Sequence, residues 1–205
     1  MEIWFLGDAV GYGASPNEAV EAIRGTGKLT AAVVGNHDWA AVHADYGMFD
    51  DRVAAALRWT SSNLSQKAKE YIEGLQDSAL VELGDSKAAL IHGSPRDHLW
   101  EYVHPSTHSE KFEEWLAELG VRVLGLGHTH VPFAWSGKRG MVFNPGSVGQ
   151  PRDGDPRASY AILTIDGKKA TAEVRRVSYD IDSSAKKIIA AGLPYTLARR
   201  LYVGA

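Results

Sequence analysis

Val121-Arg122-Val123-Leu124-Gly125-Leu126-Gly127-His128-Thr129-His130 is the stretch of sequence that decides the fold. Residues 121–126 are mostly apolar and predict a buried strand, and Gly127 lets the backbone turn where that strand ends. His128 and His130 follow directly, and imidazole nitrogens are common metal ligands. A strand that delivers two histidines at its end indicates a site at the edge of a sheet.

The same pattern, an apolar run ending in a polar residue able to bind a metal, occurs at three other places. The runs 3–6, 31–34 and 88–91 lead to Asp8, Asn36 and His92. Because strand ends in an open α/β sheet gather at one edge, we expect these side chains to converge. Their carboxylate, amide and imidazole groups suit Mn, Fe or Zn, and the two oxygens of Asp8 could bridge two ions.

Each motif has another interpretation when it stands alone. Gly7-Asp8 is typical of a turn, Asn36 before a histidine is typical of a loop cap, and His92 before Gly-Ser-Pro is typical of a loop. The four motifs occur together, each at the end of an apolar run, and this combination favours the metal site.

Predicted helices alternate with the first strands. Ser15 and Glu18 have the spacing of a capping box before a helix over Pro16–Arg24. Further helical periodicity covers residues 50–73, with a break near 60–63, and residues 110–119. The C-terminal part instead predicts antiparallel hairpins, followed by a helix near 183–190 and a short one after Pro194. This order predicts an α/β fold with mixed sheets.

Composition limits the classes of protein and partner. The 205 residues suit a single domain, 1–205, and the net charge of −3 argues against nucleic acid as an obligate partner. The absence of cysteine excludes disulfides, thiolate metal sites and thiol nucleophiles. No transmembrane run is present, so we expect no membrane partner and a cytoplasmic location.

These motifs resemble the calcineurin-like metallophosphoesterases, in particular small bacterial and archaeal phosphodiesterase-like members. The resemblance rests on Gly7-Asp8, on Gly35-Asn36-His37-Asp38, on His92, on Gly127-His128-Thr129-His130, and on the run Asn-Pro-Gly-Ser-Val-Gly-Gln-Pro-Arg at 144–152. It implies a four-layer α/β/β/α sandwich of two mixed β-sheets flanked by helices. It also implies hydrolysis of small phosphodiesters or phosphomonoesters by in-line attack of a metal-bound hydroxide.

The resemblance also assigns roles to single residues. Asp8 would bridge two metal ions, and His130 would bind the first of them. His37 would stabilise the transition state and protonate the leaving oxygen, and Asp38 would hold His37 in orientation. The second ion would be completed by three residues: Asn36, His92 and His128.

One expected motif is missing. The family pattern opens with Asp-x-His on a strand, followed by a helix, but residues 1–6 contain neither aspartate nor histidine. The chain is therefore expected to lack its first strand and helix, and the first metal keeps only Asp8 and His130. Three interpretations remain open: a misassigned start, a short form with one metal, and a protein that has lost catalysis and serves as a binding scaffold.

Further residues are candidates for contact with substrate. Arg96 and Arg152 follow two of the motifs, and a guanidinium group matches the geometry of a phosphate, although an arginine can equally be structural. Arg157 is a weaker candidate of the same kind. Trp100 and Tyr102 lie with His98, His104 and His108 in or just after an expected loop over 95–105, which could line the pocket or cover it.

Overall fold

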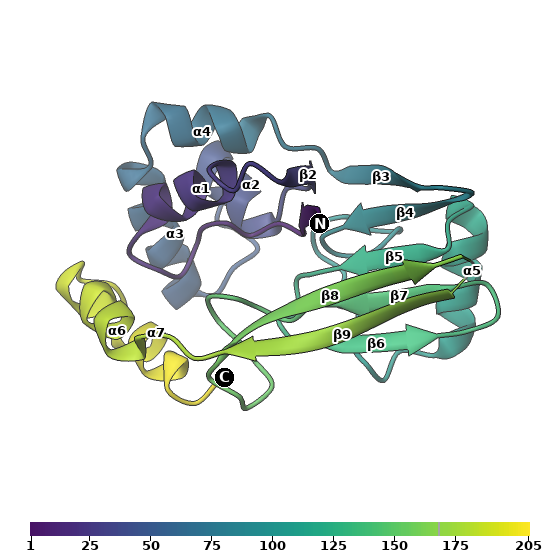
Figure 1. The fold of residues 1–205 in the computed structure, drawn as a ribbon. Coiled ribbons are helices and arrows are strands. Elements are labelled where there is room, and N and C mark those ends of the chain that lie inside the picture. Colours follow the sequence, from purple (N-terminus) through teal and green to yellow (C-terminus); the bar gives the residue numbers. More distant parts are fainter. Residues whose placement is uncertain (168) are drawn as a thin grey trace.

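The computed structural model describes residues 1–167 and 169–205 (Figure 1). Its strands are β1 (Ile3–Phe5), β2 (Leu29–Ala32), β3 (Ser78–Leu83), β4 (Ser86–Ile91), β5 (Val123–Leu126), β6 (Phe133–Ser136), β7 (Met141–Asn144), β8 (Ala158–Asp166) and β9 (Lys169–Val177). Its helices are α1 (Pro16–Arg24), α2 (Asn36–His43), α3 (Asp51–Asn63), α4 (Gln66–Glu73), α5 (Ser109–Leu119), α6 (Ile181–Ala190) and α7 (Tyr195–Leu201). The predicted α/β class with mixed sheets is confirmed.

The largest sheet carries most of the site. Its strand order is β3-β4-β5-β7-β6, in which β4, β5 and β7 run parallel and the two outer strands run antiparallel to their neighbours. Parallel β4 and β5 therefore end at the same edge of the sheet. In the part of the chain that is described, β1 and β2 form a separate parallel pair, and β8 and β9 form an antiparallel pair.

Alternation along the central strands separates two layers of core. Ile91 and Leu124 face one way and pack with Trp115 of α5, whereas Leu90 and Val123 face the other way. On that second face they pack with side chains of β8, β9, β1 and β2. Successive side chains of a strand point to opposite faces, so the all-apolar runs of β4 and β5 reflect burial on both sides.

The helices outside the large sheet form two further clusters. Side chains of α1, α2, α3 and α4 enclose a core around Val20, Leu57 and Ile72. The C-terminal helices α6 and α7 pack against α3 through Ala56. In Figure 1 these helices stand beyond the carboxyl ends of β1, β4 and β5, so the edge where the strands end lies inside the molecule.

Several local predictions were wrong. The side chain of Ser15 makes no capping bond at α1, although the helix begins at Pro16 as expected. The strand predicted over 31–34 ends at Ala32. The helical break lies after Asn63, because Asn17 accepts the Ser65 N–H at 2.8 Å and donates to the Asn63 carbonyl at 2.9 Å. These bonds tie the turn to α1 from a distance in sequence.

Candidate metal centre

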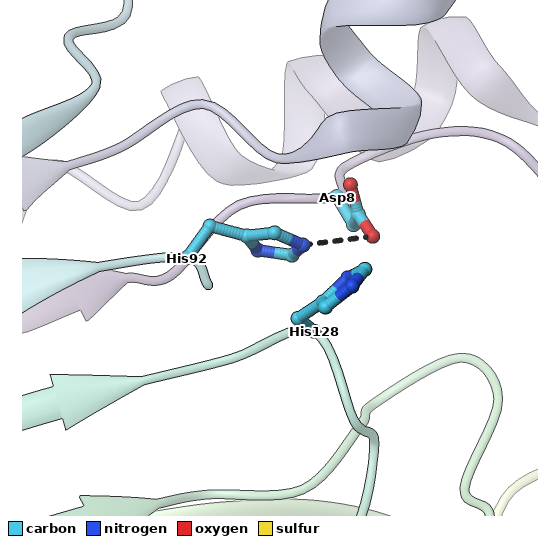
Figure 2. Close-up of side chains that lie close together, drawn as sticks. All are labelled: Asp8, His92 and His128. Atoms are coloured by element: carbon cyan, nitrogen blue, oxygen red, sulfur yellow. Dashed lines mark ion pairs between the residues drawn. The ribbon is translucent and has the colours of Figure 1, made fainter. Parts of the chain in front are cut away.

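Three side chains from three strand ends meet in one place. Figure 2 shows Asp8, His92 and His128 pointing toward one another from the segments that follow β1, β4 and β5. Each offers one ligand atom, and these atoms all lie within 4.8 Å of one another. The predicted convergence at the sheet edge is therefore present.

Asn36 adds a fourth donor from the first residue of α2. Its Oδ1 lies 3.2 Å from Nε2 of His92 and 3.1 Å from Nδ1 of His128. All four side chains of the expected second metal site therefore form one cluster. Asn36, His92 and His128 are buried, and the Asp8 side chain is 10% exposed.

Three candidate ligands have unusual backbone conformations. Asp8, His128 and His130 have φ values of 61°, 64° and 60°, in the left-handed region that non-glycine residues seldom adopt. Such strain costs of order 1–3 kcal/mol per residue and is concentrated at functional sites. Gly7, with φ of 87°, allows the approach of β1, since a Cβ there would lie 2.7 Å from Nδ1 of His92.

Main-chain carbonyls orient two of the imidazole rings. Nδ1 of His92 lies 2.6 Å from the Leu6 oxygen, and Nδ1 of His130 lies 2.7 Å from the Gln150 oxygen. A carbonyl can only accept, so each Nδ1 carries a proton, and the neutral form of either ring keeps a lone pair on Nε2. Nε2 of His92 lies 3.2 Å from Oδ2 of Asp8. Burial lowers the pKa of His92, but the nearby Asp8 carboxylate outweighs it and raises that pKa, and a cation on Asp8 would offset this effect.

Asp38 makes no hydrogen bond to the His37 ring within the described residues, and its expected role in orienting that ring stays a prediction. Its carboxylate accepts backbone N–H groups from Asp8 at 2.7 Å, Gly35 at 3.2 Å and Val10 at 3.2 Å. Neighbouring side chains on a helix point about 100° apart, so Asp38 faces the loop after β1 while the His37 ring faces elsewhere. The structure thus gives Asp38 the part of fixing the backbone that carries Asp8.

His37 is buried beside the cluster among aromatic rings. Its ring centroid lies 4.4 Å from that of Tyr12 and 4.9 Å from that of Phe49. Its backbone N–H donates to Oδ1 of Asp8 at 2.9 Å. Its Nδ1 is buried and has no hydrogen-bond partner within the described residues. A buried, unpaired imidazole nitrogen is costly unless a ligand completes it.

The protonation states suit metal binding. Burial lowers the pKa of His37 and of His128 to about 4, and that of His130 to about 3. These rings are therefore neutral at pH 7, which is the ligating form. Burial alone would raise the pKa of Asp8, but the nearby His92 and His37 outweigh it and lower that pKa. Asp8 thus keeps its negative charge.

The donor set fits a divalent cation. Oδ2 of Asp8 is buried and makes no hydrogen bond of good geometry with any described residue, although Nε2 of His92 lies 3.2 Å from it. One carboxylate, one amide oxygen and neutral imidazoles are ligands that Mn, Fe and Zn accept. A bound cation stabilises a buried carboxylate. The cluster of Asp8, Asn36, His92 and His128 can hold such a cation.

The remaining predicted residues are distributed unevenly. Arg152 lies next to the site, where its Nη2 donates to the Tyr12 hydroxyl at 2.6 Å. Arg96 is exposed beside Glu114, and Arg157 pairs with Asp155 at 2.6 Å, so neither joins the cluster.

The loop after β4 does line the cluster. The Tyr102 ring lies 4.0 Å from the His128 ring, and Nε2 of His128 lies 3.2 Å from the Trp100 oxygen. His98, His104 and His108 contribute no ligand to it among the described residues. Tyr12 was not predicted to lie at the site. Its position between Gly11 and Gly13, in the loop that begins at Asp8, could have indicated it.

No helix in the described ranges is long and apolar enough to cross a bilayer.

Comparison with known sequences identifies relatives of one kind. A family model described as the calcineurin-like phosphoesterase superfamily domain matches residues 1–168. An uncharacterized protein of Methanocaldococcus jannaschii is 35% identical over 222 residues, which cover 99% of this chain and 86% of that protein. A probable metallophosphoesterase of Methanothermobacter thermautotrophicus is 37% identical over 99 residues, covering 48% of this chain and 52% of that protein.

Solved structures give the same result. The crystal structure of a metallophosphoesterase from Sphaerobacter thermophilus matches with a TM-score of 0.80 and 34% identity, covering 100% of this chain and 89% of that one. A hypothetical protein from Pyrococcus horikoshii OT3 matches with a TM-score of 0.87, covering 98% of this chain and 84% of that one. At 22% identity the second likeness concerns the fold alone.

Proposed function

The chain belongs to the calcineurin-like phosphoesterase superfamily, and we propose that it hydrolyses small phosphodiesters or phosphomonoesters with divalent ions held at this site. The observation that carries the proposal is the cluster of Asp8, His92 and His128 within 4.8 Å, to which Asn36 adds an amide oxygen. We propose manganese, iron or zinc as the metal, because the ligands are mixed oxygen and nitrogen donors.

The four clustered residues would hold one ion. Asp8, Asn36, His92 and His128 would supply the protein ligands of this second ion, and His130 would share the first ion with Asp8. When bound, such ions make a water nucleophilic at neutral pH and offset the charge that develops during in-line displacement. The protein keeps the ligands in place through the Leu6 carbonyl behind His92 and through Asp38 behind Asp8.

His37 would act on the phosphate itself. It is buried next to Asp8 and carries a nitrogen without a partner, so a phosphoryl or leaving-group oxygen would complete its hydrogen bonding. A burial-lowered pKa keeps the free ring neutral, and a bound phosphate dianion would favour its protonated form. His37 would then stabilise the developing charge and donate a proton to the leaving oxygen.

His37→Asn separates metal binding from catalysis. We expect the variant to bind Mn²⁺ with unchanged affinity in calorimetry, because His37 is not among the ligands. Its turnover of bis(p-nitrophenyl) phosphate should fall about 10²–10⁴-fold, the range for loss of one acid–base group. Unchanged turnover would contradict the role of His37. Absence of Mn²⁺-dependent hydrolysis in the parent chain would favour the alternative, a binding scaffold that kept the fold.

An unpaired edge of β1 beside the site bears on the ion that Asp8 and His130 would share. Ile3 N–H donates to Lys28 and the Phe5 carbonyl accepts from Val33, so these two residues face β2. Peptide groups alternate along a strand, and those of Trp4 therefore face the opposite edge. Among the described residues, β1 pairs with β2 alone and β8 with β9 alone.

The two unpaired edges line one cavity. The cavity has a volume of about 1130 Å³, is bounded by β1 and β8, and reaches Asp8 and His130. Unpaired peptide groups inside a protein are costly. We propose that an extended segment of the kind that carries Asp-x-His in this family fits between β1 and β8, where it would supply the ligands that the first ion lacks.

A synthetic peptide tests this strand position. The peptide would alternate apolar residues and end in Asp-x-His, and its control would carry proline at every second position. We expect the first peptide alone to slow amide hydrogen exchange in β1 and β8 and to add a second equivalent of bound Mn²⁺. Slow exchange of the Trp4 amide without any peptide, or no effect of the peptide, would refute the proposal.

A further inference from the structure

Two arginines meet over one tyrosine beside the metal centre. The guanidinium carbons of Arg152 and Arg200 lie 5.6 Å and 5.9 Å from the centroid of the Tyr12 ring. Arg152 comes from the loop before β8, and Arg200 comes from α7 at the far end of the chain. Arg152 also donates to the Tyr12 hydroxyl, so the three side chains form one cluster. We call Arg152 and Arg200 the arginine pair.

No aspartate or glutamate side chain among the described residues pairs with the arginine pair. Within the described residues, neither guanidinium has an aspartate or glutamate oxygen within ion-pairing distance, unlike Arg157 and Arg176. Nε of Arg152 is buried and has no acceptor. Arg200 is bonded to the main-chain oxygen of Ala205 and, in the amide orientation that satisfies Gln150, to its side-chain oxygen at 3.0–3.1 Å. Two adjacent guanidinium groups without an aspartate or glutamate partner, one of them with a buried N–H that has no acceptor, indicate a place for an anion.

The arginine pair lies directly beside the proposed metal ligands. Tyr12 contacts the ring of His37 at 4.4 Å and that of His130 at 6.1 Å. The backbone N–H of Arg152 donates to the His130 carbonyl at 3.2 Å. An anion held by the pair would therefore sit next to a phosphate held at the metal centre, on the side of His37 and His130.

The chemistry of the three side chains selects phosphate. Guanidinium groups bind phosphate oxygens through paired N–H donors, and such charge-assisted bonds are among the strongest in proteins. Burial raises the pKa of Tyr12 to about 12, so its hydroxyl keeps a proton. Because Arg152 already donates to that oxygen, the hydroxyl proton is free to be donated onward.

We propose that Arg152, Arg200 and Tyr12 bind a second phosphate group of the substrate, so that the preferred substrates are phosphate esters that carry another phosphate. This proposal deepens the proposed function and rests on it for the reacting phosphate. The second phosphate would be held without reacting and would orient the ester at the metal centre.

Direct binding of pyrophosphate to the metal-free protein tests the pair without any enzyme activity. Arg200→Gln should raise the dissociation constant about 10–100-fold, which corresponds to loss of one or two charge-assisted bonds. Arg199→Gln is the matched control, because Arg199 lies next in sequence on α7 and is exposed. Arg200→Lys keeps the charge without the planar fork and should bind with intermediate affinity. A thermal melt of each variant shows whether it is folded.

The binding and kinetic outcomes decide the proposal. Loss of pyrophosphate binding in Arg200→Gln but not in Arg199→Gln supports it. Equal binding by the parent and Arg200→Gln overturns it, even if the enzyme proves active. With Mn²⁺ present, Arg200→Gln should raise KM for p-nitrophenyl pyrophosphate by a larger factor than it raises KM for p-nitrophenyl phosphate. Equal loss with both esters would mean that the pair acts on the reacting phosphate, and would also overturn it.

Discussion

The buried histidines should make the metal-free protein sensitive to acid, and His130 allows this effect to be isolated. Burial lowers the pKa of His130 to about 3, whereas an unfolded histidine titrates near pH 6.5. As the pH falls from 7 to 5, the unfolded chain takes up a proton at this position and the folded chain does not. Stability is therefore lost as the pH falls, which is the sign expected for a depressed histidine pKa.

The magnitude follows from the 1.5 pH units between about 6.5 and 5. At about 1.4 kcal/mol per unit, His130 alone costs roughly 2 kcal/mol of unfolding free energy at pH 5. In His130→Asn this cost disappears, while the amide can still donate to the Gln150 oxygen. Between pH 7 and pH 5, the free energy of unfolding of the variant should thus fall by roughly 2 kcal/mol less than that of the parent.

Urea denaturation in the presence of a chelator measures the effect. The difference between the two proteins, taken at both pH values, cancels the contributions of the other titrating groups. His104→Asn is the control, because it makes the same substitution at an exposed ring. Equal losses for His130→Asn and the parent would refute the claim that His130 is held neutral by burial.

Three substitutions test other parts of the account. Gly35→Ala would place a Cβ 2.0 Å from Oδ1 of Asp8, so we expect Mn²⁺ affinity measured by calorimetry to fall at least tenfold, whereas Gly149→Ala, with open space around it, should bind normally. Ala44 ends α2 with φ of 54°, so Ala44→Gly should stabilise the protein by about 1 kcal/mol and raise Tm by about 2–4 °C; a lower Tm would contradict this. Trp115 of α5 is fully buried, so Trp115→Ala leaves a cavity and should lower the free energy of unfolding, measured by urea denaturation, by about 3–5 kcal/mol. A loss below about 1 kcal/mol would contradict that packing.

Much of the fold was accessible from local patterns. The apolar runs of β4 and β5 and the amphipathic face of α5 each reflect burial of the segment itself, so their type could be predicted without knowing the neighbours. The resemblance to the calcineurin-like family is confirmed by the match over residues 1–168. The sandwich layering that it implies remains a prediction, because β1 and β2 stand apart from the large sheet in the described chain.

The site shows where local reasoning ends. His92 and His128 could be grouped because each follows a parallel strand of the large sheet, and such strands end at one edge. Asp8 could be added because it too follows an apolar run, although β1 pairs outside that sheet. The role of Asp38 could not be predicted, since its partners are backbone N–H groups of Asp8 and Val10, near the start of the chain. Arg200 carried no sequence signal, because its approach to Tyr12 depends on how α7 docks.

Mn²⁺-dependent hydrolysis of bis(p-nitrophenyl) phosphate by the parent chain and by Asp8→Asn tests the central claim most directly. Asp8 is the only carboxylate among the proposed ligands, and the amide that replaces it carries no negative charge to hold a cation. The account predicts turnover in the parent that a chelator abolishes and added Mn²⁺ restores, and no turnover above background in Asp8→Asn. Turnover that survives in the folded variant, or that does not depend on metal in the parent, would contradict the assignment of this cluster as a catalytic metal centre.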